Sequence, residues 1–169
     1  MKHDGRVFLG LGANLGERAG HLTAAVQELR QVTGFTLLAR ASTYESRALG
    51  DSGGPDFLNS AVAGLWRGTP LELLAACRQI ENRHGRTRPY RDAPRTLDID
   101  ILFWEGKALD SPRLTVPHPR LTGRAFALLP LLELAPGLAD PNTGRSLRSY
   151  LSPALVRQGV AVCGEAAVA

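Results

Sequence analysis

Apolar and polar positions alternate along the chain in blocks whose spacing predicts a short series of strands and helices. Apolar residues three or four positions apart predict two amphipathic helices, and short apolar runs bounded by turn formers predict strands. The expected order is strand, helix, strand, strand, helix, strand, at residues 7–12, 18–32, 35–44, 57–66, 70–85 and 96–104. Loops are expected at 47–55 and 86–95, where glycine, proline or arginine replace the apolar pattern.

Local signals mark the ends of both helices. Thr69 and Glu72 form a capping-box pattern around Pro70, which suits the first helical position. Gly34 and Gly85 are expected to end the first and the second helix, because glycine accepts the left-handed backbone found at helix ends.

Beyond residue 104 the pattern is less regular. Residues 124–134 are predicted to be helical with an interruption at Pro130, another helix is expected around Leu147, and the last ten residues are expected to be weakly ordered. We expect one domain over residues 1–169, since no repeat or linker divides the chain. The fold class is α/β (α+β), with a ferredoxin-like βαββαβ core, extra C-terminal elements and an antiparallel-rich sheet with helices on one face.

Composition agrees with a packed globular protein. Apolar residues make up 44% of the chain and charged residues 21%, which argues against disorder. No apolar run reaches the roughly 20 residues of a membrane helix, and the N-terminus has no signal-peptide core, so a cytoplasmic protein is expected. Cys77 and Cys163 have no metal-ligand spacing and are expected to be reduced.

Positive charge is concentrated in one region. The formal net charge is +4, and the cluster consists of Arg78, Arg83, Arg86, Arg88, Arg91 and Arg95. The guanidinium fork suits phosphate oxygens, so a polyanion site competes here with a solvated basic loop. Charge alone does not separate a nucleotide from a nucleic acid.

The most informative segment is the strand that begins after Arg95. Strand alternation places Asp98 and Asp100 on one face, roughly 7 Å apart, and apolar residues on the other. Two neighbouring carboxylates repel each other unless solvent or a divalent cation intervenes, and magnesium prefers a few carboxylates together with phosphate oxygens and water. The basic loop just before the strand favours the metal over a solvated sheet face.

Nucleotide-binding loops of known type are absent from the sequence. After Gly10 and Gly12, a dinucleotide fingerprint requires glycine at position 15, which is leucine, and no P-loop pattern occurs. We interpret the glycines as a tight turn beneath a site, so side chains would have to hold any nucleotide.

Two further clusters suggest ligand contacts. Arg113, His118 and Arg124 supply donors of the kind that bind phosphate tails, with His118 held between two prolines. Phe57 and Asn59 share a strand face, where an aromatic ring and a carboxamide could bind a flat heterocycle. Each residue taken alone is more often structural.

Together these segments resemble the 6-hydroxymethyl-7,8-dihydropterin pyrophosphokinase family over about residues 7–136. The matching segments are Gly12-Ala13-Asn14-Leu15, Pro55-Asp56-Phe57-Leu58-Asn59, Ile80-Glu81, Gly85-Arg86 with Arg88, Pro94-Arg95-Thr96-Leu97-Asp98-Ile99-Asp100, Arg113-Leu114-Thr115-Val116-Pro117-His118-Pro119, and Arg124 with Phe126. The string from Pro94 to Asp100 is the most specific of them.

The resemblance implies transfer of the diphosphate of ATP to the pterin hydroxymethyl oxygen in folate biosynthesis, with release of AMP. It implies two Mg²⁺ ions at Asp98 and Asp100, and phosphate neutralisation by Arg86 and Arg95. We expect a monomer that binds no nucleic acid or membrane. The ATP-binding residues it implies are Arg78, Glu81, Arg86, Arg88, Ile101, Arg113, Thr115, His118 and Arg124. The pterin-binding residues it implies are Ser46, Leu49, Gly50, Phe57, Asn59 and Phe126.

Some positions depart from the family pattern, and other functions compete. The segment from Ser46 to Gly50 lacks the usual proline, and Asp92-Ala93 replaces an aromatic–glycine pair, so Tyr90 is a candidate lid over the pterin. The alternatives are an RNA-binding ferredoxin-like module and a catalytically inactive domain that binds a nucleotide or a pterin. The carboxylates of Asp98 and Asp100 argue against RNA, since they would repel phosphate without a metal.

Overall fold

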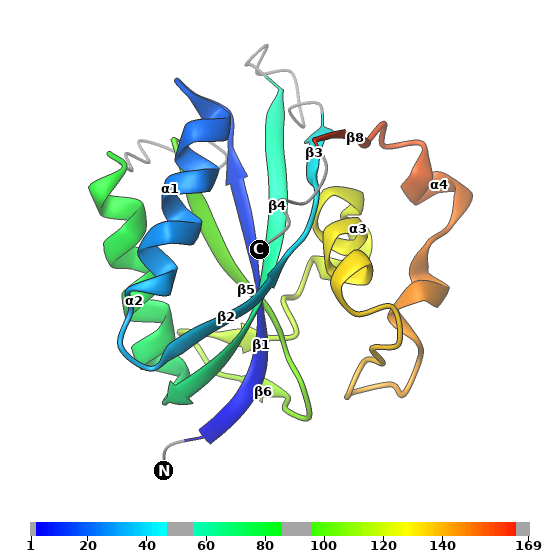
Figure 1. Ribbon diagram of the computed structural model, residues 1–169. Coiled ribbons are helices and arrows are strands. Elements are labelled where there is room, and N and C mark those ends of the chain that lie inside the picture. Colours follow the sequence, from blue (N-terminus) through cyan, green and yellow to red (C-terminus); the bar gives the residue numbers. More distant parts are fainter. Residues whose placement is uncertain (1–2, 47–55, 86–95, 165–169) are drawn as a thin grey trace.

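The computed structural model describes residues 3–46, 56–85 and 96–164, which form a sheet with helices on both of its faces (Figure 1). The core elements are β1 (His3–Ala13), α1 (Arg18–Arg30), β2 (Phe35–Arg40), β3 (Thr43–Ser46), β4 (Phe57–Gly68), α2 (Pro70–Arg83) and β5 (Asp98–Trp104). The later elements are β6 (Leu109–Asp110), β7 (Thr115–Val116), η1 (Leu121–Gly123), α3 (Ala125–Leu134), η2 (Leu147–Tyr150), α4 (Pro153–Val156) and β8 (Ala161–Gly164).

The main sheet confirms the predicted βαββαβ core. Its strand order is β5-β1-β4-β3-β8, with β2 also paired to β4, and these strands pair in antiparallel fashion. The long strands β1 and β4 lie side by side at the centre of the sheet. Residues on β5, β1 and β4 can therefore meet on one face of three neighbouring strands.

The two sides of the sheet bury separate apolar clusters. Side chains of α1 and α2 pack with Leu9, Leu11, Leu58, Ile99 and Ile101 on one face. Helix α3 packs with Phe8, Ala63 and Leu102 on the other. The expectation of helices on one face holds for α1 and α2 but is wrong for α3, which covers the opposite face (Figure 1).

The second predicted strand, at residues 35–44, is divided in the structure into β2 and β3. The carboxylate of Glu133 accepts hydrogen bonds from the Ser42 amide at 3.0 Å, the Ser42 hydroxyl at 2.7 Å and the Tyr44 hydroxyl at 2.5 Å. Burial opposes ionisation of Glu133, but these hydrogen bonds outweigh it and lower the pKa of the carboxyl. The break thus depends on a residue of α3 that lies about 90 positions further along the chain.

The C-terminal part corrects two expectations. Helix α3 continues through Pro130, which the sequence predicted to interrupt it, and buries Leu128, Leu131 and Leu132 against the sheet. This apolar packing compensates for the hydrogen bond that a proline inside a helix cannot make. Of the last ten residues, which were expected to be weakly ordered, 165–169 lie outside the described residues, whereas Ala161–Gly164 form β8, which pairs with β3. The helix expected around Leu147 is present as η2, a 3₁₀ helix.

Several local predictions are confirmed. The Thr69 hydroxyl accepts a hydrogen bond from the Glu72 amide, and the Glu72 carboxylate accepts one from the Thr69 amide, which completes the capping box. Gly85 has a φ of +72° just beyond α2, as a helix-ending glycine should. Within the described parts of the chain, no helix combines the length and apolar character needed to span a bilayer.

The two cysteines are free thiols in contrasting surroundings. Cys77 lies on α2 and is fully buried, whereas Cys163 lies on β8 and is exposed. Burial, and then the nearby Glu81 carboxylate, raises the pKa of the Cys77 thiol to about 12. Neither thiol is placed to ligate a metal together with other residues of the described ranges.

Candidate active site

The two aspartates of β5 lie on the side of the sheet away from α1 and α2. Ile99 and Ile101 belong to the core beneath those helices, so strand alternation turns Asp98 and Asp100 the other way, and both are partly exposed. In the neighbouring strand, Gly12 is the register partner of Asp98 and Gly10 that of Asp100. Both glycines lie inside β1, so interpreting them as a tight turn was wrong.

These carboxylates suit magnesium by the chemistry of their donor set. They offer hard oxygen ligands on one strand face, and no group of three or more potential protein ligands occurs among the residues that the structure describes. Magnesium usually takes one or two carboxylates and completes its shell with water and phosphate oxygens. A site completed by the substrate therefore fits Asp98 and Asp100.

Glu81 of α2 binds the backbone of β5 between the two aspartates. Its side chain is fully buried, and its carboxylate accepts hydrogen bonds from the Ile99 amide at 3.1 Å and from Arg78 at 3.0 Å. Ile99 lies between the two aspartates, so Glu81 ties the outer edge of β5 to α2 at the carboxylate pair. The geometry favours a positioning role for this predicted ATP-binding residue.

A pocket of about 210 Å³ opens beside Asp100. It is lined by Leu74, Arg78, Ile99, Asp100, Ile101, Ser111, Pro112, Arg113, Leu114, Thr115, His118 and Pro119. Five of the nine residues predicted to bind ATP are in this lining. Apolar side chains alternate in it with arginine, histidine and hydroxyl donors, which suits a flat base with a phosphate tail.

His118 enters this pocket as a neutral donor. Burial, and then the positive charges of Arg124 and Arg120, lower the pKa of its imidazole, with Asp98 opposing them. The Arg120 amide donates to Nδ1 at 3.2 Å, so the proton of the neutral ring is on Nε2. The His118 amide also donates to the Leu102 carbonyl at 2.8 Å, which fixes the loop to β5.

The predicted pterin side chains meet where β3 ends and β4 begins. The Asn59 amide donates to the Ser46 hydroxyl at 2.8 Å, and both side chains are buried. Leu58 faces the core under α1 and α2, so Phe57 and Asn59 face the same side as Asp98 and Asp100. An amide, a hydroxyl and a half-buried aromatic ring are suitable groups for the edge and face of a heterocycle.

Arg124 and Phe126 stand at the start of α3, on this same side of the sheet. The Arg124 guanidinium lies 5.4 Å from the centroid of the Phe126 ring, a cation–π contact. Gln158 holds this helix start, because its side chain accepts from the Ala125 amide at 2.9 Å and donates to the Gly123 carbonyl at 3.0 Å. Sequence reasoning missed Gln158, which no local pattern distinguishes.

Part of the predicted site cannot be placed. The residues concerned are Arg86, Arg88 and Arg95 of the basic loop, Leu49 and Gly50 of the pterin loop, and Tyr90, and they lie outside the described residues. The remaining predicted residues lie on β3, β4, β5 and α2, in and next to β7, and at the start of α3. Together, the ferredoxin-like sheet, the carboxylate pair and the pocket beside it define a nucleotide-dependent phosphotransferase.

The comparisons with known proteins identify the family. The family model described as 7,8-dihydro-6-hydroxymethylpterin-pyrophosphokinase (HPPK) matches residues 8–136. The chain is 43% identical over 149 residues to 2-amino-4-hydroxy-6-hydroxymethyldihydropteridine pyrophosphokinase of Methylorubrum extorquens, covering 88% of this chain and 94% of that protein. It is 42% identical over 147 residues to the protein of the same name from Pseudomonas aeruginosa, covering 87% and 90%. The chain therefore belongs to the HPPK family.

Solved structures agree on the fold. The chain matches an HPPK-DHPS structure in complex with substrates with a TM-score of 0.66 at 12% identity, covering 89% of this chain and 43% of that one. It matches a Plasmodium falciparum HPPK-DHPS triple mutant with a TM-score of 0.67 at 16% identity, covering 88% and 44%. The chain spans less than half the length of these two-part proteins, so the likeness concerns the HPPK fold alone. Membership of the family leaves no support for the RNA-binding alternative.

Proposed function

We propose that the protein transfers the diphosphate of ATP to the hydroxymethyl oxygen of 6-hydroxymethyl-7,8-dihydropterin, as an HPPK of folate biosynthesis. The observation that carries the proposal is the placement of Asn59 and Asp98 on either side of Gly12, on strands next to β1. This arrangement puts the groups suited to the heterocycle within one strand of the groups suited to the metal and phosphates.

In the proposed reaction the pterin hydroxyl oxygen attacks the β-phosphorus of ATP. A bond forms between that oxygen and the β-phosphorus, the bond from the β-phosphorus to the α,β-bridging oxygen breaks, and AMP leaves with the bridging oxygen. The hydroxyl proton passes to solvent. Phosphoryl transfer of this kind needs little covalent help from a protein, so positioning and charge neutralisation are its main contributions.

We propose that Asp98 and Asp100 hold a pair of magnesium ions. When bound, magnesium neutralises phosphate charge and lowers the pKa of a hydroxyl that it contacts. The chain's own carboxylates would hold this charge at the edge of the pocket that Arg78, Arg113 and Thr115 line. Those donors, with His118 Nε2 as a neutral donor, would orient the ATP.

The pterin would lie over Gly12, with Asn59 and Ser46 at its polar edge and Phe57 and Phe126 at its faces. Glycine leaves the floor open there, because a Cβ at position 12 would lie 3.2 Å from Asn59 Oδ1. Arg86, Arg88 and Arg95 would neutralise the phosphates, and Leu49 and Gly50 would complete the pterin site, as the family resemblance implies. We further propose that residues 1–169 form one domain that acts as a monomer, which light scattering would test.

The deciding experiment is identification of the nucleotide product. The pure protein is incubated with ATP, Mg²⁺ and the pterin, and nucleotides are separated by ion-exchange chromatography. AMP that requires both the pterin and Mg²⁺ is expected. ADP instead of AMP would mean attack at the γ-phosphorus, and no turnover by folded protein would refute the proposed function.

A further inference from the structure

Helix α1 contributes none of the residues assigned above, yet three of its polar side chains contact segments next to both halves of the site. The pterin half is formed by Ser46, Phe57 and Asn59, and the metal half by Asp98 and Asp100. Arg18, His21 and Glu28 point from α1 toward the strand ends and toward the end of α2. Apolar residues of the same helix, Leu22, Val26 and Leu29, pack on the sheet. One set of side chains therefore fixes the helix to the sheet, and another contacts the segments that support the site.

Arg18 joins the two strand ends at the pterin half. Its guanidinium donates to the Asp56 carbonyl at 2.6 Å and lies 3.5 Å from the Glu45 carboxylate. Asp56 directly precedes Phe57, and Glu45 directly precedes Ser46. One side chain of α1 thus holds β3 and β4 together immediately beside the proposed pterin groups.

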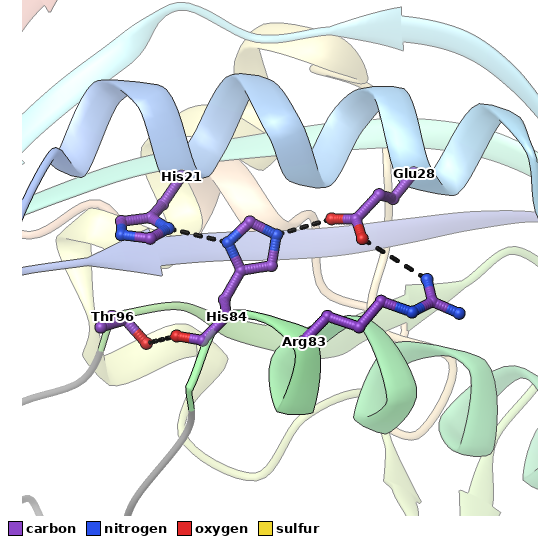
Figure 2. Close-up of polar contacts among 5 residues, drawn as sticks. All are labelled: His21, Glu28, Arg83, His84 and Thr96. Atoms are coloured by element: carbon purple, nitrogen blue, oxygen red, sulfur yellow. Dashed lines mark hydrogen bonds and ion pairs between the residues drawn. The ribbon is translucent and has the colours of Figure 1, made fainter.

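His21 and Glu28 of α1 both contact His84 at the end of α2, as Figure 2 shows. The Nδ1 atoms of His21 and His84 are 2.7 Å apart, and His84 Nε2 lies 2.6 Å from the Glu28 carboxylate. Arg83 contacts the other oxygen of Glu28 at 3.4 Å. The chain of contacts joins the middle of α1 to the end of α2.

The distances among His21, His84 and Glu28 indicate a continuous series of hydrogen bonds. The Glu28 carboxylate accepts, so His84 donates to it from Nε2, and the His84 Nδ1 atom is left to share a hydrogen bond with Nδ1 of His21. A separation of 2.7 Å fits one shared hydrogen bond between two nitrogens. No third potential metal ligand completes the pair among the residues that the structure describes.

His84 passes this support on to β5. The Thr96 hydroxyl donates to the His84 carbonyl, and Thr96 lies two residues before Asp98 (Figure 2). Glu81, one turn before His84, holds the Ile99 amide. Hydrogen bonds from the end of α2 therefore hold the chain on either side of Asp98. The contact between His21 and His84 in turn fixes the end of α2 to α1.

We propose that α1 positions the side chains of the site. Arg18 holds the pterin half in place, and the contacts among His21, His84 and Glu28 hold the metal half in place. Each half is positioned independently of the other. This inference rests on the proposed function. None of the three α1 side chains needs to touch a substrate, so they are positioning residues. A helix that only packed on the sheet would give no such division between the two halves.

The test compares Arg18→Met and His21→Phe with wild type in steady-state kinetics. Arg18→Met is expected to raise the pterin KM about tenfold, the loss typical of a hydrogen bond from a charged group, with the ATP KM changed less than about twofold. His21→Phe is expected to lower kcat about tenfold and to raise the Mg²⁺ concentration required, with the pterin KM nearly unchanged, since supports behind metal ligands typically cost about 10- to 100-fold.

Conservative variants separate positioning from general damage. Arg18→Lys keeps the charge, and His21→Asn keeps a donor near the Nδ1 position, so each is expected to recover part of its own lost constant. Arg30→Met, at an exposed position of the same helix, is the matched control and should leave all constants unchanged. Thermal unfolding of each variant shows whether the fold is intact.

The outcomes also separate this inference from the proposed function. Wild-type release of AMP tests the function, whereas the inference depends on which constant each variant changes. If both variants alter the same constant, or if losses merely follow the melting temperature, α1 is not a positioning element. If wild type releases no AMP, calorimetry of pterin and Mg·ATP binding tests the positioning role instead. Arg18→Met should then weaken pterin binding alone, and His21→Phe should weaken Mg·ATP binding alone.

Discussion

Asn59 and Asp98 face the same side of the sheet and are separated only by Gly12. Both are register partners of that glycine, Asn59 on β4 and Asp98 on β5. Strand spacing places their Cα atoms about 10 Å apart, twice the distance between neighbouring strands. A residue suited to read a heterocycle and a residue suited to hold a metal are thus set at a fixed separation by backbone hydrogen bonds.

A side chain added at Gly12 should weaken pterin binding more than ATP binding. In Gly12→Ala the new Cβ would lie 3.2 Å from Asn59 Oδ1, so the carboxamide must move by a few tenths of an ångström. We expect the pterin KM to rise several-fold, about 3- to 10-fold, with the ATP KM unchanged, because a small misplacement of a positioning group costs about this much or more. Steady-state kinetics with each substrate varied would measure the effect.

A matched glycine provides the control. Gly137 is exposed and a Cβ there would meet nothing within 4 Å, so Gly137→Ala should leave both KM values unchanged. An unchanged pterin KM in Gly12→Ala would show that the pterin does not lie over this strand.

Removing one carboxylate should abolish the effect of magnesium on both activity and melting temperature. Asp100→Asn is expected to lower kcat by about 100-fold or more, since one ligand for the metal is lost. The melting temperature of each protein without Mg²⁺ is measured first, as the reference for the effect of the metal. Mg²⁺ should raise the melting temperature of wild type but not that of the variant.

Asp110 provides the comparison for that experiment. It is exposed on β6, so Asp110→Asn changes the net charge equally without touching β5. A variant Asp110→Asn that lost activity as Asp100→Asn does would mean that overall charge, and not a metal site, explains the loss.

The pH dependence of stability should reveal His118. Because burial and two arginines lower the pKa of this imidazole in the folded protein, the unfolded chain takes up its proton first as the pH falls. The stability that the neutral ring contributes is present above about pH 6.5, the ordinary histidine value, and is lost as the pH falls toward the lower folded pKa. His118→Gln should therefore lose less melting temperature than wild type between about pH 7.5 and pH 5.

The other histidines are common to both proteins in that comparison and cancel. Equal slopes of melting temperature against pH in wild type and His118→Gln would contradict a lowered pKa of His118 in the folded protein. Thermal scans followed by circular dichroism at half-unit intervals of pH would provide both slopes.

Where signals were local, the sequence sufficed to predict the fold. The capping box at Thr69 and Glu72, the left-handed Gly85 and the alternation around Asp98 and Asp100 depend on neighbours a few residues away. Such patterns predict the βαββαβ order, because the spacing of apolar residues and the signals for the ends of each element lie within that element's own sequence. The carboxylate pair on one strand face follows from the same alternation.

Where distant residues decided, the sequence did not suffice. The break between β2 and β3 depends on Glu133, and the start of α3 depends on Gln158, neither of which is near its partner in the chain. The glycines of β1 had two local interpretations, turn or strand, and only pairing with β4 and β5 separates them. The support from α1 is likewise invisible before the helices are packed.

The two thiols differ so much in exposure that their rates of chemical labelling can report on the opening of α2. Cys163 is exposed, so an alkylating reagent should label it at once, whereas Cys77, with its pKa raised to about 12, has almost no thiolate at neutral pH. Labelling of Cys77 must wait until α2 lifts from the sheet. The slow phase of a thiol titration would therefore time the opening of the helix that carries Arg78 and Glu81, with the fast phase as its internal standard.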